Sequence, residues 1–280
     1  MKRKPARVNN VIVVSDLHCG CGLGLCPPLV RLDEGQTVRQ SPLQAVVWAW
    51  WREFWGEWVP MVTQGEPFAV VVNGDALEGR HHGATTQLAQ NLEDQARIAR
   101  TVLQPIVNAC EGRYYHIRGT EAHAGPAGEA EEELARSLGA IPSEHGHHAR
   151  YELWLSLGAG LAHLTHHIGT TGSSAYETTA LCKEYSEACS DAARWHRPAP
   201  DVVGRSHRHR HAEVRVPTKH EYGICFVTAG WQLKTPLVFR IPGGRVTMPQ
   251  IGGSLIRAGD HDVYTRHKTW EIERSKTEVI

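Results

Sequence analysis

The sequence has no run of about 20 apolar residues, the length that a bilayer-spanning helix needs. It has no excess charge of either sign, because 30 lysines and arginines balance 30 aspartates and glutamates. General electrostatic attraction to nucleic acid or anionic lipid is therefore not expected, and any attraction to phosphate must be local. No internal repeat and no low-complexity linker is found, which predicts a single domain over residues 1–280.

A secretion signal is not recognisable either. The basic start MKRKPARVNN leads directly into the short apolar run of residues 11–14, without a longer apolar segment or a small-residue cleavage site. Seven cysteines, an odd number, favour reduced thiols over a disulfide framework. We therefore expect a cytoplasmic protein without a membrane partner, and association into a homo-oligomer is left open.

The sequence does contain an alternation of strand-like and helix-like segments. Four apolar runs that end at polar residues predict strands, at residues 11–14, 68–72, 113–117 and 161–165. Helices are predicted at residues 43–59, 87–110, 129–138 and 175–195. Short β-like runs at residues 212–216, 224–229 and 237–241 predict a second sheet. This order indicates a layered α/β or α+β protein whose ligands collect at the carboxyl ends of the strands.

Aspartates and histidines follow several of these strands. Asp16 and His18 are two residues apart, as are His207 and His209, and alternate residues of an extended segment point the same way. Carboxylate oxygen together with imidazole nitrogen suits Mn, Fe or Zn better than Ca. Each motif is weak alone, but together they offer six or seven ligands. That number fits two ions that share a carboxylate and activate a water for in-line attack on phosphorus.

Taken in order, Asp-x-His, Gly-Asp, Gly-Thr-x-x-His, His and His-x-His resemble the signature of the calcineurin-like metallophosphoesterases over about residues 10–210. The segments SDLHCGCGLGLCPP, RGTEAHAG and GWQLKTP are similar to phage and prophage members of that superfamily. The resemblance implies a four-layer αββα sandwich of the α+β class, with two mixed sheets flanked by helices. Residues 211–280 are then expected to continue the second sheet and end in a C-terminal extension.

The resemblance also implies metal ligands. Asp16, His18 and His209 would hold the first ion, His166 and His207 the second, and Asp75 would bridge the two. Two divalent transition-metal ions are implied as cofactors, with Mn as the first choice and Fe, Zn, Ni or Co as alternatives.

The motif Gly119-Thr120-Glu121-Ala122-His123 departs from the family pattern of Gly-Asn-His followed by an acid. Thr120 occupies the position of the asparagine that binds the second ion, and Glu121 is an alternative ligand there. His123 is predicted to protonate the leaving group, with direct metal binding as the alternative. Arg118, His82 and His167 are predicted substrate contacts.

The function implied by the resemblance is a metal-dependent phosphoric ester hydrolase in which a metal-bridging hydroxide attacks phosphorus. Phosphodiesters are the preferred substrates, with nucleic acid or a nucleotide among the candidates. The alternatives are a phosphomonoesterase or promiscuous phosphatase, and a catalytically weak metal-binding scaffold. A third alternative is a basic nucleic-acid binder that uses the stretch GRSHRHRH at residues 204–211.

Overall fold

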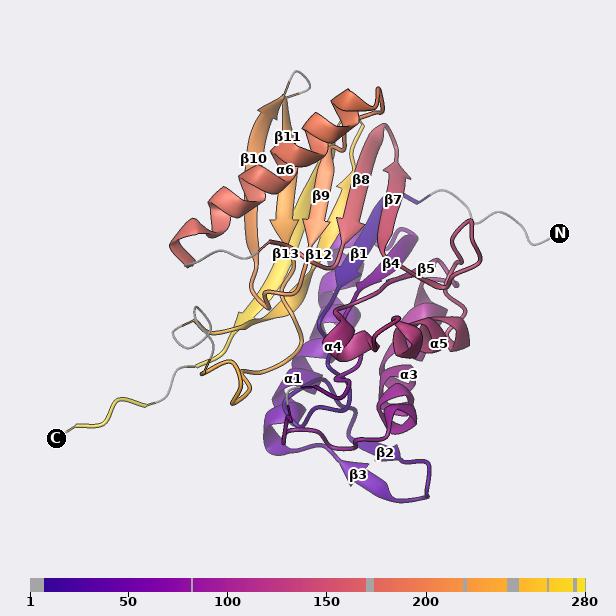
Figure 1. The fold of residues 1–280 in the computed structure, drawn as a ribbon, viewed down its shortest axis with the longest axis vertical. Coiled ribbons are helices and arrows are strands. Elements are labelled where there is room, and N and C mark those ends of the chain that lie inside the picture. The colour runs from indigo at the N-terminus through magenta and orange to yellow at the C-terminus, as the bar shows by residue number, and fades with distance from the viewer. Residues whose placement is uncertain are drawn as a thin grey trace.

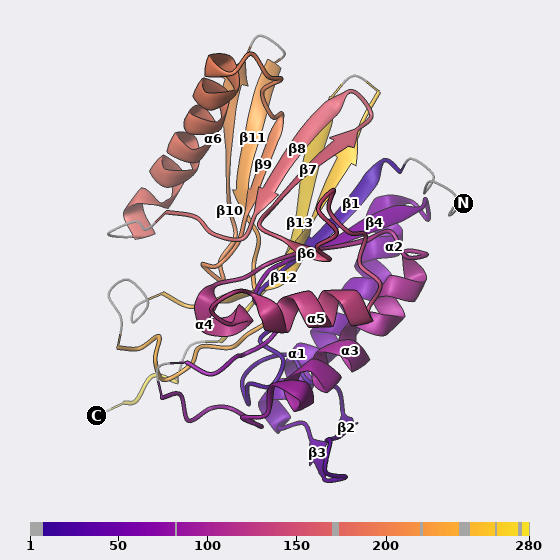
Figure 2. The ribbon, with the colours of Figure 1, turned by 45° about the vertical axis from the view of Figure 1, so that its right-hand side comes forward.

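The computed structural model describes residues 8–81, 83–169, 174–218, 221–240, 247–260, 262–273 and 276–279. Two β-sheets lie face to face, with helices α1, α3 and α5 outside one sheet and α6 outside the other (Figures 1 and 2). The predicted α+β class and the αββα order of four layers are therefore confirmed.

The first sheet contains six strands in the order β13-β12-β1-β4-β5-β6. They are β13 (Val263–Glu271), β12 (Gln250–Ala258), β1 (Asn10–Val14), β4 (Phe68–Asn73), β5 (Tyr114–Ile117) and β6 (Ala149–Arg150). The second sheet contains five in the order β10-β11-β9-β8-β7. They are β10 (Ala212–Thr218), β11 (Glu221–Val227), β9 (Val202–Arg205), β8 (Gly160–Thr165) and β7 (Glu152–Leu157). A separate hairpin joins β2 (Leu29–Arg31) to β3 (Thr37–Arg39).

The helices follow the predicted ranges closely. They are α1 (Pro42–Glu53), the π-helix η1 (Phe54–Trp58), α2 (Val59–Thr63), α3 (Leu92–Ala109), α4 (Glu121–Ala124), α5 (Glu129–Ser137), the 3₁₀ turn η2 (Ser174–Tyr176) and α6 (Glu177–Arg194). Among the described helices, none combines the length and the apolar character that crossing a bilayer requires.

The central strands are apolar throughout because both of their faces are buried. In β1, Ile12 and Val14 pack in the core under the helices, whereas Val11 and Val13 pack between the sheets. A third core lies between α6 and the second sheet, where Leu181 meets the outer face. Burial on two faces explains why these strands have continuous apolar runs rather than an alternating pattern.

The C-terminal strands correct one expectation. Residues 212–218 and 221–227 do continue the second sheet as β10 and β11, but β12 and β13 join the first sheet, where β12 pairs antiparallel with β1. The run predicted as a strand at residues 237–241 forms turns over 237–240, and residue 241 lies outside the described residues. The turns follow Pro236, which has no amide hydrogen to donate to a strand ladder.

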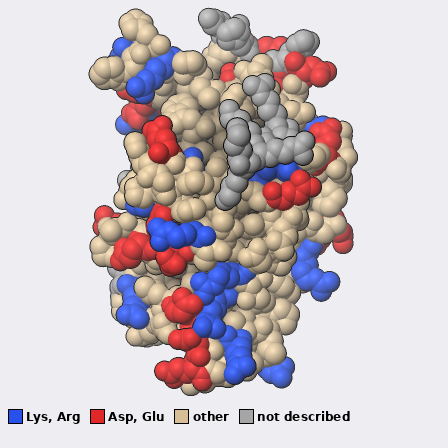
Figure 3. Space-filling model, turned by 90° about the vertical axis from the view of Figure 1, so that its right-hand side faces the viewer, with Lys and Arg blue, Asp and Glu red and all other residues tan. Residues whose placement is uncertain are grey.

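The direction of the strands positions the site. β1, β4 and β5 are mutually parallel in the first sheet, and β8 and β9 are parallel in the second. The loops after these five strands carry the aspartates and histidines that the sequence singles out. The face of the molecule in Figure 3 is not dominated by one charge, since basic and acidic side chains are interspersed on it.

Candidate metal centre

The loops after β1 and β4 run side by side and bring two buried aspartates together. The amide N–H of Asp16 donates to the carbonyl of Gly74 at 3.0 Å, and that of His18 donates to the carbonyl of Asp75 at 3.1 Å. These bonds extend the pairing of β1 with β4 beyond the strands themselves. Gly74 is required there, because an added Cβ would lie 2.4 Å from Nδ1 of His166.

The backbone at the candidate ligands is left-handed rather than extended. The φ angle is positive at Asp16 (54°), His18 (46°), Asp75 (51°), His207 (74°) and His209 (52°). The sequence argument that alternate residues of an extended segment share a side is therefore wrong for both two-residue motifs. Non-glycine residues adopt this conformation at a cost, and such residues cluster at functional sites.

The first group of candidate ligands is Asp16, His18 and His209, whose ligand atoms lie within 4.8 Å of one another. Oδ1 of Asp16 is 3.2 Å from Nε2 of His209 and 4.0 Å from Nε2 of His18. The two Nε2 atoms are themselves 3.2 Å apart. Donor atoms at such spacings suit one shared ion, because ligands at about 2.0–2.1 Å from a tetrahedral metal lie slightly more than 3 Å from each other.

The second group contains Asp16, Asp75, His166 and His207. Oδ2 of Asp75 is 3.1 Å from Nε2 of His166 and 3.9 Å from Nδ1 of His207. Asp16 therefore belongs to both groups, whereas Asp75 belongs to the second group and to a further group with His18 and His123. The geometry brings together the six residues predicted as aspartate and histidine ligands, from both sheets.

Hydrogen bonds to the outer nitrogen orient the imidazoles. Nδ1 of His18 contacts a carboxylate oxygen of Glu78 at 3.0 Å, and Nδ1 of His166 contacts the carbonyl of Asn73 at 2.6 Å. Since these oxygens accept, each Nδ1 donates, and each Nε2 is left as the nitrogen that can bind a metal ion once the ring is neutral. Metal-binding histidines are held in this way in proteins.

Sequence reasoning missed Glu78 and Gln232. Both side chains are buried, and the amide of Gln232 donates to the Glu78 carboxylate at 3.0 Å. Glu78 also contacts His81 at 3.2 Å, and it forms a further group of potential ligands with His81 and His123. The available signal was an acid three residues after Asp75 in the segment GDALEGR.

The charges of the metal-free site are strongly coupled. Burial alone would raise the pKa of Asp75, but the neighbouring His166 holds this pKa well below its ordinary range. Burial alone would lower the pKa of His166, but Asp75 raises it to about 10. A bound metal ion needs the neutral imidazole, so binding must displace a proton from His166.

Two buried atoms test whether these residues fit a metal ion. Oδ1 of Asp16 and Nε2 of His166 have no partner in hydrogen-bond geometry, although Nε2 of His209 lies 3.2 Å from the first and Oδ2 of Asp75 lies 3.1 Å from the second. Unpaired buried polar atoms are costly. A divalent ion that prefers mixed oxygen and nitrogen ligands would give both atoms a partner after His166 loses its proton, so such an ion fits this donor set.

Thr120 lies against Asp75. Its amide N–H donates to Oδ1 of Asp75 at 2.8 Å, and its hydroxyl lies 3.3 Å from the same oxygen. Glu121, the alternative ligand at this position, is exposed and belongs to none of the groups found among the described residues. Thr120 is therefore placed to orient the carboxylate of Asp75.

His123 lies at the centre of the site. Its Nδ1 contacts the carbonyl of Glu78 at 2.5 Å, and its Nε2 is 4.0 Å from Oδ2 of Asp75. Burial lowers the pKa of His123 to about 4 in the metal-free protein, where the ring is neutral at pH 7. His123 is therefore placed for either predicted role, proton transfer or metal binding, since His18, Asp75 and His123 form a further group of potential metal ligands.

The predicted substrate contacts are placed differently from one another. Arg118 is not at the pocket: its guanidinium donates to the carbonyls of Ala149 and Ala127 at 3.0 and 3.1 Å, which ties it to the scaffold. His167 is exposed beside His207, with 4.6 Å between the ring centres. His82 lies outside the described residues.

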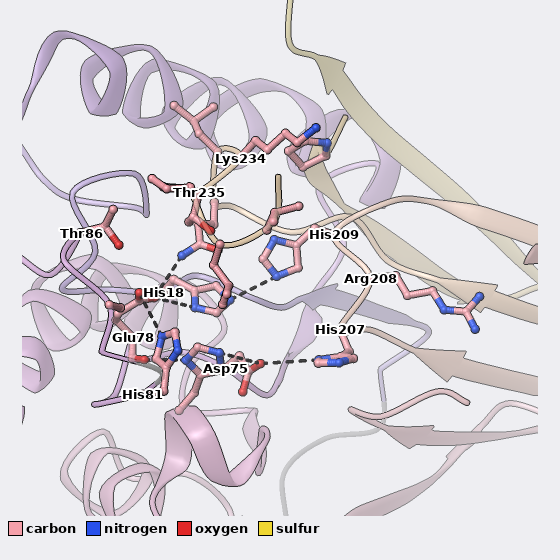
Figure 4. A pocket seen from close by; sticks show the side chains of 18 of the residues that line it. His18, Asp75, Glu78, His81, Thr86, His207, Arg208, His209, Lys234 and Thr235 are labelled. Carbon is pink, nitrogen blue, oxygen red and sulfur yellow. Dashed lines mark hydrogen bonds and ion pairs between the residues drawn. The ribbon is translucent and has the colours of Figure 1, made fainter. Parts of the chain in front are cut away.

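A cavity of about 500 Å³ opens onto the candidate ligands. Figure 4 shows His18, Glu78 and Asp75 at one end of it and Lys234 and Thr235 on the opposite wall. Arg208 points away from Asp75 in the same view. The volume is within the range of small-molecule sites, about 300–1,000 Å³, so the cavity can hold more than a phosphate group.

No family model and no curated protein matches the chain. Among solved structures, a conserved protein of Streptococcus pneumoniae described as a predicted phosphoesterase is 12% identical, with a TM-score of 0.35, and the match covers 94% of this chain and 98% of that one. Vacuolar Protein Sorting 29 from Cryptosporidium parvum is 8% identical, with a TM-score of 0.40 and the same coverage. A Vps29 double mutant from Entamoeba histolytica is 8% identical, with a TM-score of 0.38 and coverage of 94% and 99%.

Proposed function

We propose that this protein is a metal-dependent phosphoric ester hydrolase of the calcineurin-like metallophosphoesterase type, related to phage and prophage members and acting in the cytoplasm. The observation that carries the proposal is the convergence of two buried aspartates and four histidines from both sheets beside a cavity that four of these residues line. Two of their buried atoms have no hydrogen-bond partner, as expected of metal ligands.

The proposed ligands form two sets. Asp16, His18 and His209 would hold one ion, and His166 with His207 would hold the second, with Asp75 between them. Divalent ions, with Mn²⁺ as the first choice, supply Lewis acidity and a nucleophile at neutral pH when they are bound.

The surrounding residues would prepare this site. Thr120 holds the Asp75 carboxylate through its amide and hydroxyl groups, in place of the asparagine ligand of the family. Glu78 fixes the ring orientation of His18. His123 is proposed to give the leaving group a proton from Nε2. Because Nδ1 donates to a carbonyl and the neutral ring has no hydrogen at Nε2, this step requires the imidazolium form, which the negative charge of a bound phosphate would favour.

Phosphodiesters are the proposed substrates. The cavity has a volume of about 500 Å³ and is lined by Lys234 and Thr235 as well as by candidate ligands, which leaves room for a substituent on the phosphate. The experiment is hydrolysis of bis-p-nitrophenyl phosphate and of p-nitrophenyl phosphate by the purified protein with Mn²⁺. We expect the diester to be hydrolysed with the higher kcat/KM. The reverse preference would contradict the diester assignment and favour a phosphomonoesterase.

A metal-binding scaffold is the second candidate, and the replacement of the family asparagine by Thr120 favours it. Metal analysis separates the two functions. A protein that binds two ions per chain but hydrolyses neither ester would be a scaffold. His123→Ala adds a further distinction: we expect it to abolish hydrolysis with unchanged metal content, whereas a loss of metal would identify His123 as a ligand.

A further inference from the structure

Glu131, in the first turn of α5, is a buried carboxylate without a role in the proposed chemistry. Its side chain is fully buried, and no lysine or arginine is paired with it among the described residues. Nε2 of the buried His116 lies 3.8 Å from Oε1, too far for a hydrogen bond. A buried carboxylate is expensive unless its oxygens accept hydrogen bonds. The location of its donors therefore indicates what it does.

Both oxygens of Glu131 accept a backbone N–H, and each N–H comes from a different ligand loop. Oε1 accepts from Ala76, the residue after Asp75, at 2.7 Å. Oε2 accepts from Gly119, the residue before Thr120, at 2.5 Å. One side chain thus joins the loop after β4 to the loop after β5.

These bonds close a ring around Asp75. The amide of Gly119 is bonded to Glu131, and the next amide, that of Thr120, is bonded to Oδ1 of Asp75 at 2.8 Å. From Asp75 the chain leads directly to Ala76, which is bonded to Glu131 again. The two loops are in close contact, because a Cβ at Gly119 would lie 1.9 Å from Oδ1 of Asp75.

We infer that Glu131 is a positioning residue that holds the loops of Asp75 and Thr120 together, so that the Asp75 carboxylate is directed at the metal site before an ion binds. The inference rests on the metal centre of the proposed function. It assigns to Glu131 no contact with substrate or metal, because both oxygens are occupied by backbone amides.

Glu131→Gln tests the inference because the side chain keeps its size but has only one acceptor oxygen. Its NH₂ group must then face one of the two backbone donors. Glu132→Gln is the matched control: Glu132 is adjacent in α5 and also accepts two backbone N–H groups, from His148 at 3.0 Å and Ala149 at 2.8 Å. Those amides lie at and just before the start of β6 and belong to no ligand loop; Glu132 also contacts the guanidinium of Arg118 at 3.5 Å.

The first measurement is Mn²⁺ affinity by competition with a chelator. We expect Glu131→Gln to weaken binding by about 10–100-fold, the typical cost of losing a residue that orients metal ligands. Glu132→Gln should leave the affinity within about twofold, because it leaves the Asp75 loop intact. Equal affinities for the wild type and Glu131→Gln would overturn the inference and leave the proposed function in place.

The second measurement is amide hydrogen exchange in the metal-free wild type and both variants. We expect Ala76 and Gly119 to be protected in the wild type and in Glu132→Gln, and to exchange roughly tenfold faster in Glu131→Gln. Unprotected amides in the wild type would overturn the inference even if Glu131→Gln did not fold. A wild type that binds no Mn²⁺ but shows this exchange pattern would refute the proposed metal centre, while the role of Glu131 in joining the two loops would stand.

Discussion

Gly119→Ala provides the most direct perturbation of the site. The added Cβ would lie 1.9 Å from Oδ1 of Asp75 and 2.3 Å from its backbone nitrogen. Because carbon and oxygen atoms do not approach closer than roughly 3 Å, the two loops must separate by about 1 Å. The bond from the Thr120 amide to Asp75, now 2.8 Å, would then be too long for a hydrogen bond.

Two costs follow from this displacement. Overpacking a buried contact costs about 1–3 kcal/mol. Leaving a buried carboxylate without one of its donors costs about another 1–3 kcal/mol. Allowing for partial relaxation, we expect the free energy of unfolding to fall by about 2–4 kcal/mol. Hydrolysis should fall by about 100-fold, since a shift of about 1 Å has that effect on reacting geometry.

The assay is urea unfolding combined with metal analysis and ester hydrolysis. Gly56→Ala is the control, because an added Cβ there meets no atom within 4 Å and the residue is helical. Its free energy of unfolding should stay equal or rise by up to about 1 kcal/mol. If Gly119→Ala unfolded at the wild-type urea concentration with full metal content, the close approach of the two loops would be refuted.

Three further predictions concern other parts of the molecule. His207→Ala and His209→Ala should each lower metal content and nearly abolish hydrolysis, whereas a nucleic-acid binder would lose only binding. Arg118→Ala should lower the free energy of unfolding by about 1–3 kcal/mol, because the Arg118 guanidinium is bonded to carbonyls of the scaffold. It should not raise KM for the ester. A raised KM with an unchanged free energy of unfolding would contradict this placement of Arg118. Burial alone would raise the pKa of Glu213, but hydrogen bonds, the largest from His267, lower it to about 2 from 4.5. Its contribution to the free energy of unfolding is therefore present above pH 4.5 and lost as the pH falls toward 2. In urea unfolding measured across this pH range, Glu213→Gln should lose less stability on acidification than the wild type. An equal loss in both proteins would refute this.

The strands and their ends could be predicted because they depend on local sequence. β1 and β4 are short apolar runs buried on both faces, and Asp16 and Asp75 follow them directly. Parallel neighbours then bring those ends together without further information. The helix around α3 could be predicted for the same reason, since its apolar face recurs with helical spacing.

The rest depends on contacts between distant residues. Glu78 meets Gln232 across 154 positions, and nothing near either residue indicates the other. β12 has two adjacent glycines, which weaken a strand pattern, and its place beside β1 is set by pairing across the whole chain. The backbone at His18 and His209 is left-handed rather than extended, so the two-residue spacing singled out residues that do lie together, but for a wrong geometric reason.

The distribution of the candidate ligands between the sheets has a mechanical consequence. Asp16, His18 and Asp75 extend from the first sheet, whereas His166 and the histidines after β9 extend from the second. An ion bound by both sets would link the two sheets to each other through its ligands. Metal binding would then be coupled to the cohesion of the two halves, and the thermal stability of the whole protein should rise with the free metal concentration by mass action.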